Sequence, residues 1–442
     1  MPKSRRAGSE LQRFERRMER RTAKIGVIGL GYVGLPLAAE FARAGYHVTG
    51  FEIDAKRVAT LNAGRSYIQD VPTRDVRDHV RSGRLTATLD FDRLRSMDAI
   101  DICVPTPLRK TRDPDVSYIV SAVEEIAKRL RRGQLVVLES TTYPGTTDEL
   151  VRPMLEERGL RAGRDFFLAF SPERIDPGNP VFHTRNIPKV VGGVSAQCTR
   201  AAALLYGAVV DRVVPASSTQ VAETVKLLEN TFRSVNIGLV NEIALMCDKM
   251  GINVWEVIDA AATKPFGFMP FYPGPGLGGH CIPVDPFYLS WKARQSGFEA
   301  RFIELAGQVN GSMPYHVSRR VAEALNARRR SVRGARVLLL GVAYKADIDD
   351  VRESPSLDLM EILQRDGAHV DYCDPYVPTL RHGGRLYRSR PFRASSLKAA
   401  DCVVIATAHK VFDQKLIARH ARSVVDCRNA LKGRRTRGVY RL

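Results

Sequence analysis

The stretch that decides the fold is KIGVIGLGYVGLPLAAEFARAGYHVTGFE, residues 24–52. It begins with a short apolar run that ends in glycine, continues as an amphipathic helix that Gly45 stops, and closes on a second apolar segment. A strand, a helix and a strand in that order predict one βαβ unit, in which the two strands run parallel. The sequence therefore predicts an α/β protein.

A glycine-rich turn joins the first strand of this unit to its helix. Gly29, Gly31 and Gly34 follow the pattern GxGxxG, with Tyr32 and Val33 between the last two glycines. Glycine permits the tight turn, and it lets a pyrophosphate approach the N–H groups at the start of the helix. These five residues are therefore expected to bind a dinucleotide.

Glu52 indicates which dinucleotide is expected. It ends the second strand, where the ribose of a bound dinucleotide needs a hydrogen-bond acceptor. A carboxylate there repels the ribose phosphate of NADP, so the sequence favours NAD. Arg57, which is also expected at the cofactor, keeps NADP open as the alternative.

Further apolar segments in the first half of the chain are strand candidates: AIDICV, LVVLES, DFFLAF, KVVGG and DRVVP. Helical stretches separate several of them, which favours a parallel sheet. In an open parallel sheet, ligands bind at the carboxyl ends of the strands. Thr106, Thr141 and Glu173 follow three of these strands, so they are expected near the reactive end of the cofactor.

The composition restricts the class of protein. Of 442 residues, 44% are hydrophobic and 26% are charged, as in soluble globular proteins, and no apolar run is long enough for a membrane span. The N-terminal segment 1–22 is basic and lacks the apolar middle of a secretory signal, so it is interpreted as a flexible tail of a cytoplasmic protein. The seven cysteines are scattered and form no CxxC pair, which argues against disulfides and against a structural metal.

The formal net charge of +20 raises the question of nucleic acid binding. Much of the excess lies at the two ends of the chain, and the other arginines are not interleaved with aromatic residues. This distribution does not favour nucleic acid, and it also suits an anionic small substrate. A nucleic-acid-binding protein without catalysis is kept as a rival hypothesis.

A long helix is predicted in the middle of the chain. Ser217 and Gln220 form a capping box, and the helix continues to Gly251 over roughly 30 residues, about 45 Å. Its apolar positions recur at threes and fours: Val221, Val225, Leu228, Phe232, Val235, Leu239, Ile243, Met246 and Met250. The helix is therefore expected to link two domains and to pack against a second subunit. Lys226 and Asn230, four residues apart on one face, are candidate site residues.

The α/β pattern restarts at Arg336 with RVLLLGVAY. The predicted fold class is α/β, with two doubly wound Rossmann-like domains joined by a long central helix and a helical dimerisation region. The predicted segments are a basic flexible tail (1–22), an NAD-binding domain (23–215), a central helical region with a cysteine loop (216–325) and a second Rossmann-like domain (326–442).

The loop PGPGLGGHCIPVDP, residues 273–286, surrounds one thiol with glycine and proline. Backbone amides in a glycine-rich turn can stabilise an oxyanion, and cysteine is suited to attack an aldehyde carbon. Cys281, four residues before Asp285, is therefore a candidate nucleophile, whereas the other six cysteines are expected to be buried hydrophobes. His280 is interpreted as a packing residue, because no other His or Cys stands at metal-ligand spacing.

Seven motifs in order carry a resemblance across nearly the whole chain: GLGYVG, ICVPTP, ESTTYPGTT, FSPE, VKLLENTFRSVNIGLVNE, PGPGLGGHCIPVDP and GVAYKADIDDVRESPS. With these motifs the chain resembles the UDP-glucose/GDP-mannose dehydrogenase family. The resemblance implies an NAD domain, a central dimerisation region and a C-terminal domain that binds the nucleotide of the sugar. It also implies a homodimer that oxidises the primary alcohol of a UDP-sugar to a carboxylate with two NAD and one water.

The resemblance assigns roles to residues of the central region. Cys281 matches the nucleophile that captures the aldehyde as a thiohemiacetal, which is then oxidised to a thioester. Lys226 and Asn230 match the pair that holds the developing oxyanion. Asp285 matches the residue that orders or activates water.

Other roles follow from the flanking motifs. Thr141 matches the family's water-holding threonine, and Glu173 matches its hydrolytic glutamate. Lys345 matches a residue that reaches the substrate, and Arg352 matches one that reaches the pyrophosphate of the cofactor. Gly278 is expected to contact the substrate from the cysteine loop.

Departures from the family pattern concern the sugar pocket. Val284 stands where many members have lysine, Phe266 lies near the place of a substrate-binding arginine, and Pro177 replaces an acid. The pattern is similar to the branch that acts on UDP-N-acetylhexosamines, so UDP-N-acetylglucosamine and UDP-N-acetylgalactosamine are expected substrates beside UDP-glucose. dTDP-glucose and GDP-mannose stay open, as does a simple two-electron dehydrogenase, which would not need Cys281.

Overall fold

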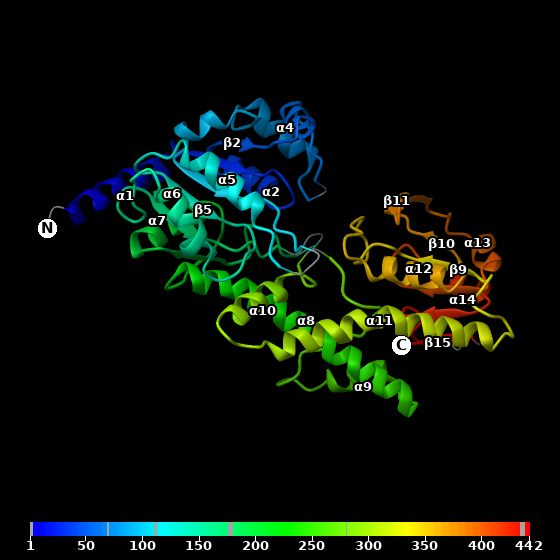
Figure 1. Cartoon of the computed structure of the whole chain (residues 1–442). Coiled ribbons are helices and arrows are strands. Elements are labelled where there is room, and N and C mark those ends of the chain that lie inside the picture. Colours follow the sequence, from blue (N-terminus) through cyan, green and yellow to red (C-terminus); the bar gives the residue numbers. More distant parts are fainter. Residues whose placement is uncertain are drawn as a thin grey trace. The chain divides into compact units, whose positions relative to one another are not determined.

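The computed structural model describes residues 3–68, 70–109, 113–175, 179, 181–279, 281–433 and 438–442, and only the backbone of residues 3–9. Two compact units divide the chain: Met1–Glu229 with Trp291–Ser296, and Asn230–Ser290 with Gly297–Leu442. Each unit contains one large sheet (Figure 1). None of the described helices combines the length and the apolar composition that crossing a membrane requires.

The first unit is built on an eight-stranded sheet in the order β3-β2-β1-β4-β5-β6-β7-β8. Its strands are β1 (Lys24–Ile28), β2 (His47–Phe51), β3 (Leu85–Thr88), β4 (Ala99–Ile102), β5 (Leu135–Leu138), β6 (Phe167–Phe170), β7 (Lys189–Gly193) and β8 (Val213–Pro215). The first six strands are parallel in the doubly wound order of a Rossmann fold, as the sequence predicts.

Helices flank this sheet in Figure 1. They are α1 (Lys3–Glu19), α2 (Gly34–Arg43), α3 (Ala55–Asn62), α4 (Thr73–Arg81), η1 (Phe91–Ser96), α5 (Ser117–Ala127), η2 (Thr147–Val151), α6 (Arg152–Glu156) and α7 (Ala196–Gly207). Separate apolar clusters cover the two faces of the sheet, because successive strand residues point to opposite sides.

Strand β7 departs from the parallel sheet that the sequence favours. It pairs antiparallel with β6, with Phe170 opposite Gly192. A parallel pair needs a crossover connection, usually a helix, and residues 171–188 form no helix in their described part. The reversal places Lys189, the first residue of β7, at the edge of the sheet where β6 ends.

The prediction of a flexible N-terminal tail is wrong from Leu11 to Met18. This part of α1 buries Leu11, Phe14 and Met18 in the core of the first unit, and Phe14 packs on Phe167 of β6 with ring centroids 6.3 Å apart. The three apolar residues recur at helical spacing, and the arginines of the segment occupy the other faces of the helix.

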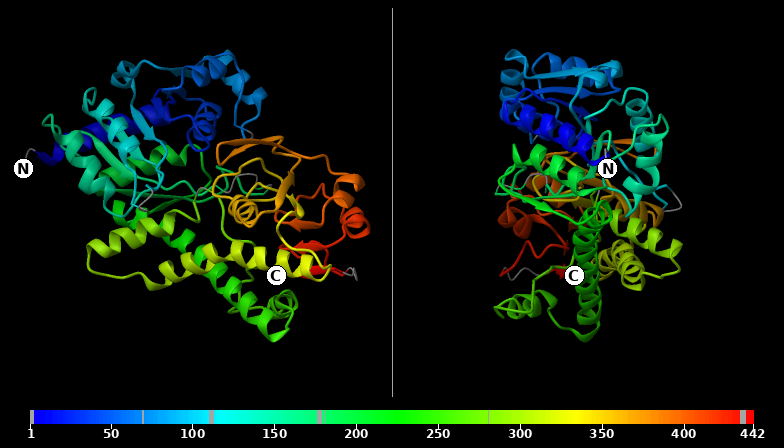
Figure 2. Two further views of the ribbon diagram at one scale, coloured as in Figure 1. Left: turned by 45° about the vertical axis from the view of Figure 1, so that its right-hand side comes forward. Right: turned by 90° about the vertical axis from the view of Figure 1, so that its left-hand side faces the viewer.

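Helix α8 (Thr219–Met250) confirms the long helix predicted from the sequence. Figure 2 shows it as one continuous helix. The cap differs from the prediction, because Ser218 rather than Ser217 accepts a hydrogen bond from the first turn, from Val221 N at 3.2 Å.

The second unit is built on the five-stranded parallel sheet β10-β9-β13-β14-β15 and a separate hairpin, β11-β12. Its strands are β9 (Arg336–Leu340), β10 (His369–Cys373), β11 (Thr379–His382), β12 (Arg385–Arg388), β13 (Cys402–Ile405), β14 (Val424–Asp426) and β15 (Val439–Arg441). The remaining helices are α9 (Val254–Ala261), α10 (Asp285–Gln295), α11 (Arg301–Asn326), α12 (Pro355–Arg365), α13 (Ala394–Ala399) and α14 (Gln414–His420). This sheet confirms the second doubly wound region expected after Arg336.

Candidate active site

The glycine-rich turn after β1 is packed so closely that side chains do not fit. Gly29 has φ +88°, and a Cβ on it would lie 2.7 Å from Cys103 O. A Cβ on Gly34 would lie 1.9 Å from Gly29 O, whereas one on Gly31 would meet no described atom within 4 Å. The two outer glycines therefore let the turn form, and the middle one keeps space open in front of it.

The start of α2 is available for an anion. Its N-cap residue, Val33, makes no side-chain capping bond in the structure as described. The first N–H groups of a helix lack partners within the helix, and they carry partial positive charge. The turn and the helix start thus provide the backbone donors and the space that a pyrophosphate needs.

Glu52 is fixed beside this turn. It is buried, its Oε1 accepts a hydrogen bond from Ile53 N at 2.8 Å, and its Oε2 accepts one from Leu30 N at 3.2 Å. Arg57 Nη1 lies 3.5 Å from Oε2, and its guanidinium lies 5.6 Å from the centre of the Tyr67 ring. The predicted cofactor residues Glu52 and Arg57 are therefore neighbours, and the cradle fits NAD.

The carboxyl edge of the first sheet collects the predicted strand-end residues. Strands β4, β5 and β6 are adjacent and parallel, so the segments that hold Thr106, Thr141 and Glu173 leave the sheet at one edge. The β4 and β5 ends are tied together, because Ser140 Oγ donates a hydrogen bond to Val104 O at 2.8 Å. The structure thus supports the convergence that the sequence predicts for this edge.

Glu173 is held by several donors at this edge. Its Oε1 accepts from Arg174 N at 2.7 Å and from Ile175 N at 2.9 Å, and its Oε2 accepts from Lys189 Nζ at 2.9 Å. Its backbone carbonyl accepts from Lys226 Nζ. Burial raises the pKa of Glu173, but the charge and hydrogen bond of Lys189, the charge of Lys226 and the hydrogen bond from the Arg174 backbone together hold that pKa below its usual value. Two predicted site residues, Glu173 and Lys226, are therefore in contact.

Glu223 is a residue of this region that the sequence did not single out. It is buried one turn before Lys226 on α8, and it accepts hydrogen bonds from Gly145 N at 2.6 Å and Thr147 N at 2.9 Å. Burial raises the pKa of Glu223. The first turns of α8 thus fix the segment that follows Thr141.

The second unit brings together three predicted residues of the cysteine loop and α8. Asn230 Nδ2 donates to Asp285 Oδ2 at 2.5 Å, and Asp285 is buried. The carbonyl of Cys281 accepts from Val284 N at 3.0 Å and from Asp285 N at 2.8 Å. This turn at the start of α10 holds a half-buried Cys281 next to the Asn230–Asp285 pair.

Glycines let the cysteine loop pack against the segment that carries Lys345 and Arg352. A Cβ on Gly278 would lie 2.6 Å from the Cβ of Tyr344, and Gly279 N donates to Arg352 O at 3.0 Å. The Arg352 side chain pairs with Asp350 of its own segment at 2.6 Å. The segments that carry Gly278 and Lys345 thus pack together within the second unit, and the contacts predicted for Lys345 and Arg352 stay predictions.

For the other positions that the sequence singled out, the structure adds no further part of the site. His280 and Pro177 lie outside the described residues. The side chain of Phe266 is 71% exposed, so no described contact shows what it would recognise. The six cysteines other than Cys281 are buried, as predicted.

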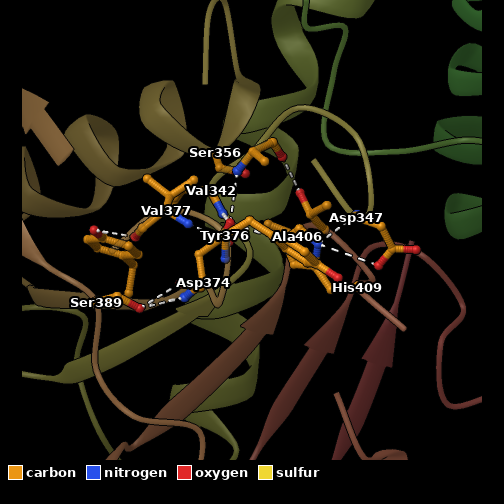
Figure 3. A network of polar contacts seen from close by, with 12 residues as sticks. Val342, Asp347, Ser356, Asp374, Tyr376, Val377, Ser389, Ala406 and His409 are labelled. Carbon is orange, nitrogen blue, oxygen red and sulfur yellow. Dashed lines mark hydrogen bonds and ion pairs between the residues drawn. The ribbon is translucent and has the colours of Figure 1, made fainter. Parts of the chain in front are cut away.

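A buried network holds the segment that leads to Lys345 (Figure 3). Asp374 follows β10, and its Oδ2 accepts from Val342 N at 2.8 Å and from Ala343 N at 3.1 Å. His409 Nε2 lies 3.0 Å from the same oxygen, while His409 Nδ1 accepts from Asp347 N at 2.9 Å. His409 is therefore the tautomer with its proton on Nε2, and it joins the ends of β9, β10 and β13.

The His409→Phe variant keeps a ring in this place but loses both hydrogen bonds. It leaves Asp374 with one donor fewer in a buried site, so we expect the free energy of unfolding to fall by about 2–3 kcal/mol. Chemical denaturation followed by circular dichroism measures this change. The matched control is His369→Phe at the exposed start of β10, where we expect a change within about 0.5 kcal/mol. Equal effects of the two substitutions would contradict the role of the network.

The dinucleotide cradle, the acid after β2 and the doubly wound order of β1 to β6 together define an NAD-binding oxidoreductase of the Rossmann type. Models of the UDP-glucose/GDP-mannose dehydrogenase family match the chain in three parts. The NAD binding domain matches residues 23–210, the central domain matches residues 220–312, and the UDP binding domain matches residues 338–433.

Relatives match most of the chain. A UDP-N-acetyl-D-glucosamine 6-dehydrogenase of Pseudomonas aeruginosa is 38% identical over 391 residues, 88% of this chain and 91% of the relative. An NDP-N-acetyl-D-galactosaminuronic acid dehydrogenase of Ralstonia solanacearum is 36% identical over 93% of this chain and 97% of the relative. The solved structure of the UDP-N-acetyl-D-mannosamine dehydrogenase of Pyrococcus horikoshii has a TM-score of 0.86 and 35% identity, over 95% of this chain and 98% of that one.

The chain belongs to the UDP-glucose/GDP-mannose dehydrogenase family. It is an NAD-dependent oxidoreductase of the nucleotide sugar dehydrogenase type, and the predictions of the enzyme class and of NAD are confirmed.

Proposed function

We propose that the protein oxidises the primary alcohol of a UDP-N-acetylhexosamine to a carboxylate, through a covalent intermediate on Cys281. The observation that carries this proposal is the loop geometry of Cys281 beside the Asn230–Asp285 hydrogen bond. This arrangement of Cys281, Asn230 and Asp285 is found in a chain that is 38% identical to a UDP-N-acetyl-D-glucosamine 6-dehydrogenase.

The covalent route solves a chemical problem of the four-electron oxidation. The alcohol first loses a hydride and a proton, which gives an aldehyde that could escape. The thiolate of Cys281 adds to the aldehyde carbon as a thiohemiacetal, whose loss of a second hydride and a proton gives a thioester. Water then cleaves the thioester to the acid and the free thiol. NAD accepts the two hydrides, one molecule for each step.

Other residues of the sequence motifs stabilise the oxyanion and position water in this mechanism. Lys226 and Asn230 stabilise the oxyanion that forms at the former aldehyde oxygen. Thr141 and Glu173 hold the hydrolytic water, and Asp285 orders water on the other part of the site. The buried hydrogen bond from Asn230 fixes the orientation of Asp285.

The second unit is proposed to bind the nucleotide of the substrate. The UDP binding domain model matches residues 338–433, which include most of β9 and all of β10, β13 and β14, and Asp374 and His409 hold the segment that leads to Lys345. In this assignment Lys345 and Gly278 contact the substrate. Arg352 reaches the pyrophosphate of NAD.

The names of the relatives favour an N-acetylated sugar as the substrate, but these names differ in the configuration of the sugar. Their names give glucosamine, mannosamine and galactosaminuronic acid derivatives at similar identity. UDP-N-acetylglucosamine and UDP-N-acetylgalactosamine are the substrates we favour, and UDP-glucose, dTDP-glucose and GDP-mannose remain the alternatives.

A panel of nucleotide sugars tests the proposal. With limiting UDP-N-acetylhexosamine and excess NAD, we expect two NADH for each sugar consumed, measured by absorbance and by quantifying the uronic acid. One NADH per sugar would replace the proposal by a two-electron dehydrogenase. No NADH with any sugar, together with salt-sensitive binding to DNA or RNA, would favour the nucleic acid hypothesis.

The Cys281→Ser variant tests the covalent step. A serine hydroxyl is a much poorer nucleophile than a thiolate, so we expect acid formation to fall by about a thousandfold or more. The control is Cys247→Ser, which changes a buried thiol of α8 outside the cysteine loop. Acid formation by Cys281→Ser at the rate of the control would rule out the thioester.

We also propose that the protein is a homodimer that pairs through α8. Six apolar side chains recur on one face of this helix and are exposed in the single chain: Val221 46%, Leu228 61%, Phe232 48%, Leu239 53%, Met246 46% and Met250 54%. A stripe of this length is costly in water, and a second copy offers a complementary stripe by twofold symmetry.

Leu239→Glu tests the dimer. In a twofold interface it would bring like charges into an apolar contact, so we expect a monomer by analytical ultracentrifugation. The control Leu386→Glu changes a side chain of equal exposure, 53%, on strand β12. The proposal fails where both variants keep the oligomeric state of the unchanged protein.

We further propose a cytoplasmic location. All seven cysteines are free thiols in the structure, which suits a reducing compartment. Separation of cell fractions with an antibody against the protein tests this location.

A further inference from the structure

A buried lysine stands at the carboxyl edge of the first sheet, where the hydrolytic residues are proposed. Lys189 is 4% exposed. Its Nζ lies 2.7 Å from Glu139 Oε1 and 2.9 Å from Glu173 Oε2. It reaches this edge only because β7 is antiparallel to β6. One cation therefore bridges the ends of strands β5, β6 and β7.

Three more polar groups surround this bridge. Asp101 of β4 accepts a hydrogen bond from Tyr206 Oη of α7 at 2.9 Å, and the Tyr206 ring centre lies 5.1 Å from Lys189 Nζ. Cys103 Sγ lies 3.5 Å from Glu139 Oε2. All of these side chains are buried. They share one face of the sheet, because strand residues two apart point the same way.

The cluster contains more carboxyl groups than cations. Burial raises the pKa of Asp101 well above its usual value, and the nearby Glu139 raises it further. Burial also raises the pKa of Glu139. Glu173 differs, because Lys189 and Lys226 together with the Arg174 backbone hold its pKa below the usual value against burial. Glu173 is therefore the carboxyl of the cluster whose pKa is lowered, whereas those of Asp101 and Glu139 are raised.

Among the described residues, the donors to Glu173 leave one lone-pair direction of its carboxylate for a further donor. A carboxylate offers about four lone-pair sites, and the described residues occupy three of them, through Arg174 N, Ile175 N and Lys189 Nζ. Lys226 adds a donor to the backbone carbonyl of Glu173, and Arg174 pairs with Glu229 at 2.6 Å. The remaining site suits one water molecule.

We propose that Lys189 is a positioning residue for the thioester hydrolysis: its buried ammonium, paired with Glu173, fixes that side chain as the acceptor for the attacking water. This role rests on the proposed function, because it presupposes a thioester on Cys281. In the step concerned, the water oxygen bonds to the thioester carbon, and the carbon–sulfur bond breaks with its electron pair on sulfur. One proton of the water goes to the sulfur, and the other leaves the product acid.

A purely structural role of Lys189 explains its ion pairs with Glu139 and Glu173 less well than a positioning role does. A buried ion pair contributes little net stability, because the cost of removing two charges from water offsets their attraction. The clearest effect of the ion pair between Lys189 and Glu173 is on the protonation of Glu173, which is proposed to accept a hydrogen bond from the attacking water. The charged and titratable groups that face Glu173 are Lys189 from β7, Glu139 from the end of β5, Lys226 from α8 and Arg174 beside it.

The test is the Lys189→Met variant. Without the ammonium, the largest of the causes that oppose burial is lost and the pKa of Glu173 rises, so more of the carboxylate is protonated at a pH where the unchanged enzyme still works. We expect the acidic limb of the pH profile of acid formation to move up by at least about one pH unit, which is a tenfold loss below it. Stopped-flow traces should show a burst of two NADH per active site and then slow turnover. NAD affinity by calorimetry should stay the same.

Two further variants keep the test decisive. Asp101→Asn is the matched control, because it alters a buried carboxyl of the same cluster that pairs with Tyr206 and not with Lys189 or Glu173. We expect it to keep the pH profile of the unchanged enzyme. Where Lys189→Met does not fold, Lys189→Met with Glu139→Gln lacks the second buried carboxylate, and we expect the same shift of the limb and the same burst.

The outcomes separate this inference from the proposed function. An unchanged enzyme that forms two NADH per sugar, together with a folded Lys189 variant that has the original limb and no burst, overturns the role of Lys189 alone. An unchanged enzyme that forms no NADH, or one NADH per sugar, overturns the proposed function and the inference with it. An equal shift in Asp101→Asn would assign the effect to the packing of the cluster and overturn the inference.

Discussion

The ion pairs of Lys189 with Glu139 and Glu173 are the interaction on which the proposed hydrolytic site of the first unit depends. They join groups at the ends of β5 and β6 to the first residue of β7. The carbonyl of Glu173 in turn binds Lys226, which places a turn of α8 against the same edge. One turn earlier on this helix, Glu223 holds the backbone at Gly145. Lys189, Lys226 and Glu223 thus connect the strand-end segments of the sheet with the first turns of the long helix.

Much of the fold follows from local sequence patterns. The βαβ unit at residues 24–52, the strand ends and α8 were predictable, because hydrophobic periodicity and glycine placement report on residues close in sequence. The direction of β7 was not, because an apolar pentapeptide has no signal for which way it pairs. The helix at the N-terminus was not predicted, because its many basic residues suggested a solvated tail. Its apolar residues Leu11, Phe14 and Met18 nevertheless stand at helical spacing.

The candidate site, like the fold, has one part that the sequence predicted and another that it did not. Cysteine, lysine and glycine motifs predicted the groups that the structure brings together, Glu173 with Lys226 and Asn230 with Asp285. The supporting residues escaped prediction, because each acts through a contact between distant positions. The Asp374–His409 pair forms between the ends of two different strands, and Lys189 resembled an ordinary first residue of a strand. Local patterns thus indicated the reacting groups better than the groups that hold them.

The covalent intermediate is the central claim, and intact-protein mass spectrometry measures it most directly. The protein with Glu173→Gln, quenched in acid during turnover with NAD and the UDP-sugar it oxidises, should gain the mass of one nucleotide-sugar acyl group, and peptide mapping should place it on Cys281. The same experiment with Cys281→Ser should show no added mass. NADH formation without any covalent adduct in the Glu173→Gln protein would contradict the account.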